Sequence, residues 1–200
     1  MNLDDTKIYF SISKFASKIE VTTAELKKNH WIRLIDLYYA LMLPSGNDAS
    51  IIIAENIGGI INIFKQIPDL KEIVYKREVF KKIYTLKVIN PMGYFVSEMN
   101  KNAKFLGMKH TIFANPHGMD HKKNKSTAYD MGILCCRVLR IEKFCKIVST
   151  IDYSCEMEEK DNTIYTKEWQ NTNKLLGRKG WYGIKTGITP FAGPCMAASF

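Results

Sequence analysis

The chain has 200 residues, which is the length of one domain and enough to bury a hydrophobic core. Its 46% hydrophobic and 24% charged residues are globular values and exclude a disordered chain. The formal net charge of +9 comes from short basic groups without a nucleic-acid-binding motif, which argues against a nucleic-acid partner. A solvated basic surface explains this charge, and an anionic substrate or polymer is the remaining alternative.

The five cysteines predict neither a disulfide framework nor a thiolate zinc site, because their number is odd and no C-x-x-C pair occurs. We expect three of them to serve as apolar filling in a helical region: Cys135, Cys136 and Cys145. The N-terminus is acidic and has no apolar core region, so it is not a signal peptide. The most apolar run, Ile51–Phe64, is interrupted by polar residues and does not predict a membrane span.

Hydrophobic periodicity predicts helices through most of the chain and a β-hairpin at its end. Asn47 and Asp48 are good capping residues for a helix that follows them, as are Ser126 and Thr127 for a later one. The predicted elements, in chain order, are a short strand in Lys7–Ser13, helical segments over Arg33–Met42, Asn47 to Gly58-Gly59, Ile60–Gln66, Lys71–Lys87, Phe95–Leu106 and Ala128–Val138, a helix or turn over Phe144–Asp152, and strands over Trp181–Thr189 and Cys195–Phe200.

Three polar segments separate these elements. Asn90-Pro91-Met92-Gly93 has the composition of a turn, and His110–Lys125 is a loop rich in His, Asn, Pro and Gly. Glu158–Thr163 is polar and expected to be exposed. The last hairpin is marginal by itself, and a chain that stops at Phe200 in the middle of a strand suggests a cut end.

Two short motifs carry the candidate chemistry. Ser45-Gly46-Asn47 places a hydroxyl, a glycine and an amide in a turn before a helix N-terminus, which also offers free N–H groups. By local rules alone this stretch is a corner between two helices. Lys185-Thr186-Gly187 on a predicted strand supplies a charge, a hydroxyl donor and, at Gly187, room for a substrate backbone, so it can receive a carboxylate. Acyl-transfer enzymes with a Ser–Lys pair combine Ser-x-x-Lys with such Ser-x-Asn and Lys-Thr-Gly elements.

Six blocks in order resemble the serine-type D-alanyl-D-alanine carboxypeptidases, the low-molecular-mass penicillin-binding proteins. The resemblance covers most of Lys7–Phe200 and implies an α+β fold like that of serine β-lactamases and transpeptidases, with a helical lobe against an antiparallel sheet that is incomplete here. The blocks are Leu41–Ala49 (LMLPSGNDA), Phe95–Met108 (FVSEMNKNAKFLGM), Thr111–Asp120 (TIFANPHGMD), Ser126–Met131 (STAYDM), Asn171–Leu176 (NTNKLL) and Gly183–Met196 (GIKTGITPFAGPCM).

The resemblance also implies roles for the motif residues. Ser45 would be the second serine, which relays protons between the lysine of the nucleophile motif and the leaving amine, and Asn47 would hold the substrate amide. Lys185 and Thr186 would bind the terminal carboxylate of D-alanine. Ile188 would offer its backbone N–H to the oxyanion hole. The expected partner is a peptide ending in D-Ala-D-Ala, or a β-lactam if a nucleophile is present, and no metal or cofactor is implied.

The nucleophile motif departs from the family pattern. The only Ser-x-x-Lys near the start is Ser11-Ile12-Ser13-Lys14, 34 residues before Ser45, about half the family spacing. Moreover, Ile12–Leu26 resembles the family segment that follows the nucleophile helix, so we do not assign Ser11 and Lys14 as the catalytic pair. We therefore expect little or no carboxypeptidase activity from this polypeptide alone.

Two explanations fit this departure. The chain could be truncated at both ends, or it could be a degenerate homologue that binds peptide without catalysis. Because both ends depart from the family pattern, truncation is favoured. We expect one partial catalytic domain over 1–200, with an insertion at about 65–94. The family acts outside the cytoplasm, although this chain shows no signal peptide.

Two other classes of protein share parts of this pattern. His110, His117 and His121 lie beside Asp120 and could suggest zinc, but the family resemblance already explains this segment as a loop at the edge of the cleft. A β-lactamase proper fits the LPSGNDA, NPHGMD and NTNKLL blocks less well.

Overall fold

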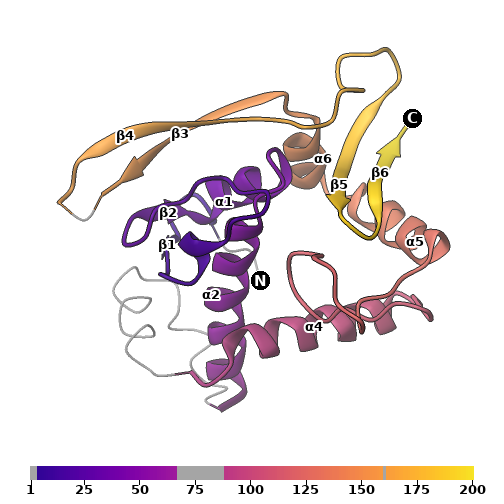
Figure 1. The fold of residues 1–200 in the computed structure, drawn as a ribbon, viewed down its shortest axis with the longest axis horizontal. Helices are drawn as coiled ribbons and strands as arrows, with labels where there is room; N and C mark the ends of the chain where they lie inside the picture. The colour runs from indigo at the N-terminus through magenta and orange to yellow at the C-terminus, as the bar shows by residue number, and fades with distance from the viewer. Residues whose placement is uncertain (1–3, 67–87, 160) are drawn as a thin grey trace.

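The computed structural model describes residues 4–66, 88–159 and 161–200, and it has an α+β architecture, as predicted (Figure 1). None of the described helices is long and apolar enough to cross a membrane. The helices are η1 (Ala16–Lys18), α1 (Leu34–Met42), α2 (Asn47–Gln66), α4 (Pro91–Phe105), α5 (Ala128–Val138) and α6 (Glu142–Ser149). The strands are β1 (Tyr9–Ser11), β2 (Trp31–Arg33), β3 (Asp152–Glu158), β4 (Ile164–Gln170), β5 (Tyr182–Thr189) and β6 (Gly193–Ser199).

The strands form two separate antiparallel sheets. The first has the order β1-β2-β3-β4, and β2 joins β3 through a single pair, Trp31 opposite Glu158. The second is the β5–β6 hairpin, which pairs from Tyr182 opposite Ser199 to Thr189 opposite Gly193, with a shift in register between Gly183 and Lys185. Figure 1 shows the long β3–β4 hairpin reaching away from β5–β6, with α6 between the two. The predicted terminal hairpin is confirmed.

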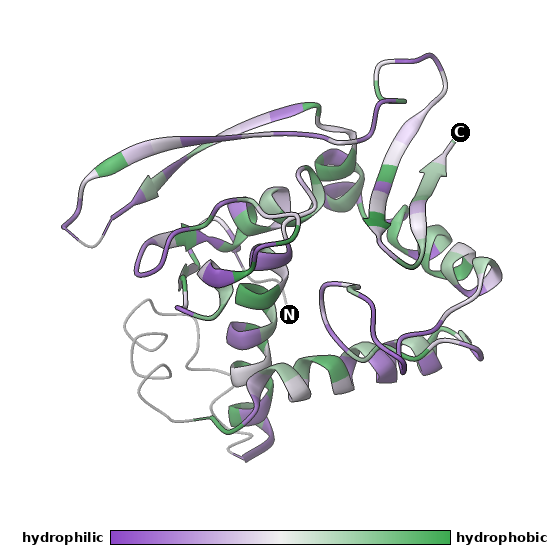
Figure 2. Cartoon of the chain, viewed as in Figure 1, coloured by the Kyte–Doolittle hydropathy of each residue, from purple (hydrophilic) through white to green (hydrophobic). Residues whose placement is uncertain are grey.

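The β3–β4 hairpin is missing from the sequence prediction. Its strands bury few side chains, among them Cys155, Met157 and Trp169, and their other positions are largely exposed and polar. Figure 2 shows the hairpin as mainly hydrophilic toward its tip. A strand pattern with so little apolar alternation carries a weak local signal, so pairing with the rest of the sheet decides its structure.

The core joins the first sheet to α1 and α2. Its fully buried side chains include Phe10, Ile32 and Leu37. An aromatic stack runs through its edge: the ring centroids of Tyr39 and Tyr153 are 3.6 Å apart and nearly parallel. The Tyr153 hydroxyl donates to Asp36 Oδ1 at 2.7 Å, which fixes the long hairpin to a helix near the start of the chain.

A buried charge completes this junction. Asp36 is 0% exposed, and Arg33 donates to both of its carboxylate oxygens, at 2.6 and 3.0 Å. The hydrogen bond with the Asp36 carboxylate raises the pKa of Arg33, and burial together with the same carboxylate raises the pKa of Tyr153. A buried carboxylate is tolerated only when it is paired in this way.

Two predicted boundaries are wrong. One helix, α2, continues through Gly58-Gly59 to Gln66, where the sequence suggested a break. Gly58 is where α4 crosses: a Cβ there would lie 1.9 Å from the carbonyl oxygen of Pro91. In addition, Asn90–Gly93 is the start of α4 and not a separate turn, because the Asn90 side chain caps the helix by accepting from Gly93 N at 3.0 Å, with Pro91 in the first turn.

Other expectations have mixed outcomes. The predicted α1, α5 and the end of α4 before Gly107 are confirmed, and α6 occupies much of Phe144–Asp152. All five cysteines are free, but Cys136 is exposed and is not apolar filling, because it lies on the open side of α5. Most of the insertion predicted at 65–94, and the segment Lys71–Lys87, lie outside the described residues.

Replacing Gly58 with Ala is expected to lower the free energy of unfolding by about 1–3 kcal/mol, because α4 must move away from the added methyl group. Gly132→Ala is the matched control, since Gly132 is an exposed helical glycine with open space around its Cα. That control should raise stability by about 0.5–1 kcal/mol through helix propensity. Urea unfolding followed by circular dichroism measures both, and equal effects would contradict the close α2–α4 crossing.

Removing the Tyr153 hydroxyl should cost about 1–2 kcal/mol, because a buried carboxylate oxygen loses one of its donors. Tyr153→Phe keeps the ring stack with Tyr39, so the effect isolates the hydrogen bond. Tyr129→Phe is the control, because Tyr129 is 78% exposed on α5. Thermal unfolding of the two variants should differ by several degrees; indistinguishable midpoints would mean that the Asp36 contact contributes nothing.

Candidate active site

Ser45 lies in a constrained turn between α1 and α2. Gly46 N donates to the Ala40 carbonyl at 3.1 Å, and Asn47 N donates to the Thr22 carbonyl at 2.9 Å. A Cβ at Gly46 would lie 2.7 Å from the Ala40 carbonyl oxygen, so only glycine fits beside Ser45. Ser45 itself has a φ of +64°, an uncommon conformation for a residue with a side chain, and costs of 1–3 kcal/mol are typical of such positions. The turn is therefore held in place by its surroundings.

Asp48 provides much of that restraint. Its carboxylate is 2% exposed and accepts from Ala24 N at 2.9 Å and from Leu26 N at 3.0 Å. It therefore ties the segment before β2 to the first turn of α2, where a negative charge is also favoured by the helix dipole. The sequence identified Asp48 only as a cap, because its backbone partners lie more than twenty residues away.

Lys185 on β5 reaches this turn from the far end of the chain. Its Nζ donates to Ser45 Oγ and to the Thr186 carbonyl, each at 2.5 Å. The side chain is largely buried, and burial lowers the pKa of Lys185 to about 8. Two residues that lie 140 positions apart are thus in contact.

Thr172 connects the same two motifs by a second route. Its backbone N and its hydroxyl both donate to the Leu43 carbonyl, at 3.1 and 3.2 Å, and its Oγ1 lies 2.6 Å from Thr186 Oγ1. Thr172 lies within the Asn171–Leu176 block but was not predicted as a site residue. Its role depends on two contacts distant in sequence, which no local pattern reveals.

The other predicted binding residues lie at the start of α2 and on β5. Asn47 is 7% exposed, and its side chain forms no hydrogen bond within the described part of the chain. Thr186 is half-buried, whereas Gly187 and Ile188 are exposed on β5. Among the described residues β5 pairs only with β6, so its second edge carries no strand. The contribution of the Ile188 N–H to an oxyanion hole stays a prediction.

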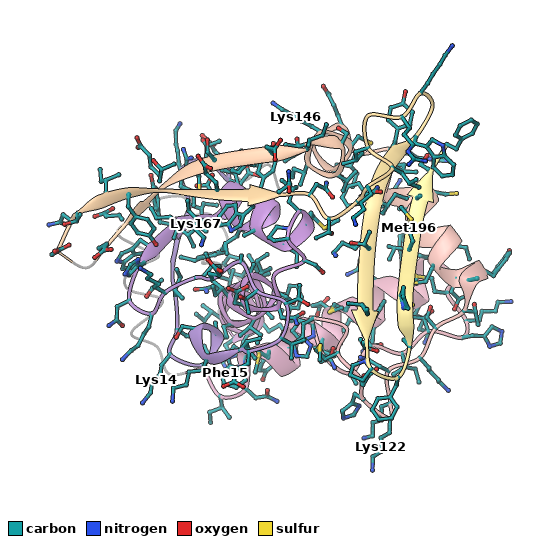
Figure 3. All side chains as sticks on the ribbon, turned by 45° about the horizontal axis from the view of Figure 1, so that its top comes forward. Lys14, Phe15, Lys122, Lys146, Lys167 and Met196 are labelled. Atoms are coloured by element: carbon teal, nitrogen blue, oxygen red, sulfur yellow. The ribbon has the colours of Figure 1, made fainter. Side chains whose placement is uncertain are left out.

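The Ser11–Lys14 pair does not form a comparable site. Ser11 lies opposite Trp31 in β1, and Lys14 is exposed. Figure 3 shows Lys14 pointing outward beside Phe15, far from the β5–β6 hairpin that carries Met196. The Ser13 hydroxyl accepts from Ala16 N at 3.0 Å, as a helix cap does. The arrangement agrees with leaving Ser11 unassigned as a nucleophile.

The loop 110–125 is organised by hydrogen bonds within itself and to β5. His117 and His121 each accept a backbone N–H through Nδ1, and burial lowers the pKa of His117. Asp120 accepts from the Thr189 hydroxyl at 2.8 Å, which joins the loop to the end of β5. Within the described residues, no three His, Cys, Asp or Glu side chains come together in a group that could hold a metal ion.

The comparisons with known proteins agree with this geometry. The family model described as D-alanyl-D-alanine carboxypeptidase matches residues 92–200. The chain is 31% identical to D-alanyl-D-alanine carboxypeptidase DacF of Bacillus subtilis over 98% of its own length, and 26% identical to the D-alanyl-D-alanine carboxypeptidase of Streptomyces sp. K15 over 98%. These matches cover 43% and 60% of those relatives, so the chain spans about half of their length.

Solved structures place the fold in the same group. The crystal structure of the Streptomyces K15 DD-transpeptidase matches with a TM-score of 0.78 and 27% identity, over 99% of this chain and 67% of that chain. The recognition from sequence is confirmed, as is the fold class. The chain belongs to the D-alanyl-D-alanine carboxypeptidase family of serine hydrolases, the low-molecular-mass penicillin-binding proteins.

Proposed function

We propose that this chain binds the D-Ala-D-Ala terminus of peptidoglycan stem peptides and forms the substrate-binding side of a site that removes the terminal D-alanine through an acyl-serine intermediate. The observation that carries the proposal is the contact between Lys185 and Ser45, which unites the two motifs on one surface. The names of the relatives and the K15 DD-transpeptidase fold support the substrate class.

Lys185 and Thr186 would receive the terminal carboxylate. With a pKa of about 8, most Lys185 side chains are protonated at pH 7, so the residue supplies a positive charge. The Thr186 hydroxyl adds a second donor, and its bond to Thr172 fixes its position. A charged and a neutral donor on a rigid strand suit a carboxylate well.

Asn47, Gly187 and Ile188 would position the rest of the peptide. The Asn47 amide, which has no partner among the described residues, is available to pair with the substrate amide. Gly187 allows the substrate backbone to lie close to the strand, and the exposed Ile188 offers its backbone N–H toward an oxyanion. Ser45 would relay a proton to the leaving amine, with the attacking serine supplied by a Ser-x-x-Lys motif at the family spacing.

A second candidate is a peptide-binding homologue without carboxypeptidase activity. The exposed position of Lys14, far from the β5–β6 hairpin (Figure 3), favours it for this polypeptide, because the Ser-x-x-Lys sequence at Ser11 is not part of the site. Both candidates require peptide binding, and both predict little carboxypeptidase turnover by this polypeptide alone.

Peptide binding can be measured by calorimetry at pH 7 with an N-acylated peptide ending in D-Ala-D-Ala. Lys185→Met should weaken binding by about 10–100-fold, because a hydrogen bond to a charged group contributes about 1.5–3 kcal/mol. Lys174→Met is the control, because Lys174 is an exposed lysine that precedes β5 in the chain. The Lys174→Met variant should bind the peptide as tightly as the unmodified chain does.

The L-Ala-L-Ala peptide tests stereochemical selection and should bind more weakly than its D-Ala counterpart. Equal affinity of the chain and its Lys185→Met variant for the D-Ala-D-Ala peptide would overturn the carboxylate role of Lys185.

A further inference from the structure

In this structure an amine that can act as a base lies beside the Ser45 hydroxyl. The sequence gives it no lysine at the family spacing, but the fold places Lys185 Nζ 2.5 Å from Ser45 Oγ. A serine hydroxyl becomes a nucleophile when an adjacent group accepts its proton. We propose that Ser45 and Lys185 form a self-sufficient Ser–Lys dyad, in which Ser45 itself is acylated by activated, uncharged acyl donors such as aryl esters.

The surroundings of Ser45 support this assignment. Ser45 is half-exposed, so an acyl donor can reach its hydroxyl. Its positive φ is the kind of backbone strain that accumulates at functional positions. The hydroxyl also lies two residues before Asn47, where the 20-residue helix α2 begins, and the positive end of that helix stabilises a developing negative charge.

Lys185 can alternate between the two states that the reaction needs. Its pKa is about 8 because burial disfavours the charged form, so about a tenth of the side chains are neutral at pH 7 and half at pH 8. The elements packed against β5, together with the loop bonded to Thr189, carry these ionisable groups: Glu142, Lys143, Cys145 and Lys146 of α6, Cys195 of β6 and Asp120 of the loop. None of them contributes to the shift, which comes from burial alone.

The reaction balances with water as the only co-reactant. The neutral Lys185 amine accepts the Ser45 proton while Oγ bonds to the ester carbonyl carbon, and the bond from that carbon to the aryl oxygen breaks. The leaving phenolate takes the proton from the Lys185 ammonium, or it departs as an anion and the ammonium releases that proton to solvent; either way the amine becomes neutral again. Lys185 then accepts a proton from water, whose oxygen attacks the acyl-Ser45 ester, and the released Ser45 oxygen takes this proton back from the Lys185 ammonium.

This activity differs from the proposed carboxypeptidase role, although both use Ser45 and Lys185: here Ser45 is the group acylated, and there it relays a proton. A D-Ala-D-Ala carboxylate engages Lys185 as an ammonium ion, which removes the base. An aryl ester without a carboxylate leaves the amine free. The dyad therefore predicts that the chain turns over neutral esters whether or not it removes D-alanine from a peptide.

The dyad can be tested with p-nitrophenyl butyrate for rates and a fluorophosphonate probe for mapping. Ser45→Ala should reduce hydrolysis to background and abolish labelling, and the labelled peptide of the unmodified chain should contain Ser45. Lys185→Met should lower the rate by about 100-fold or more, the typical contribution of a general base. Ser11→Ala and Lys14→Met are matched controls outside the site and should react normally.

The pH dependence of the hydrolysis rate shows whether Lys185 acts as a base or only supports the structure. The rate should rise with pH and reach half of its plateau near pH 8, because only the neutral amine accepts the proton. Circular dichroism of each variant checks that it folds. Labelling at a residue other than Ser45, or a folded Lys185→Met variant with full activity, would overturn the dyad.

The outcome is independent of peptide binding. If calorimetry shows D-Ala-D-Ala binding while Ser45 remains unlabelled, the dyad is wrong and the proposed function stands. If Ser45 is labelled and hydrolyses the ester but no peptide binds, the dyad stands and the proposed function is wrong.

Discussion

The contact between Lys185 Nζ and Ser45 Oγ joins two parts of the fold that belong to different elements and share no strand pairing. Ser45 belongs to the corner between α1 and α2, and Lys185 belongs to the β5–β6 hairpin, which shares no strand pairing with the first sheet. Thr172 adds parallel bonds between the Leu43 carbonyl and Thr186. Because both sides are fixed, the amine stays largely buried beside the hydroxyl, and this burial tunes the charge of Lys185.

Residues that do not touch Lys185 Nζ or Ser45 Oγ themselves hold the two segments in place. Asp48 holds the first turn of α2 against the segment before β2, and Gly46 lets the turn pass close to Ala40. Asp120 fixes the other end of β5 through Thr189. The positive φ of Ser45 persists because contacts of the neighbouring residues hold the backbone in that conformation.

The sequence predicts the parts whose signals are local. The α1 helix follows from apolar spacing, Thr127 caps α5 as expected, and the two motifs predicted as one candidate site contain Ser45 and Lys185, which are in contact. The β3–β4 hairpin was missed because its exposed positions hide the strand period, and α2 continues past Gly58 because contact with α4 overrides the preference of glycine for breaks. The contact of Lys185 with Ser45 could not be derived from local spacing, since 140 residues separate the two.

The charge state of Lys185 tests the account most directly. Carbon-13 labelling of lysine side chains, with Lys185→Met to assign the resonance, allows its titration to be followed by NMR. A buried amine in contact with Ser45 should titrate with a midpoint near pH 8. A midpoint near 10.4, the ordinary value for lysine, would show that Lys185 is solvated and that the Ser45 contact does not form in solution.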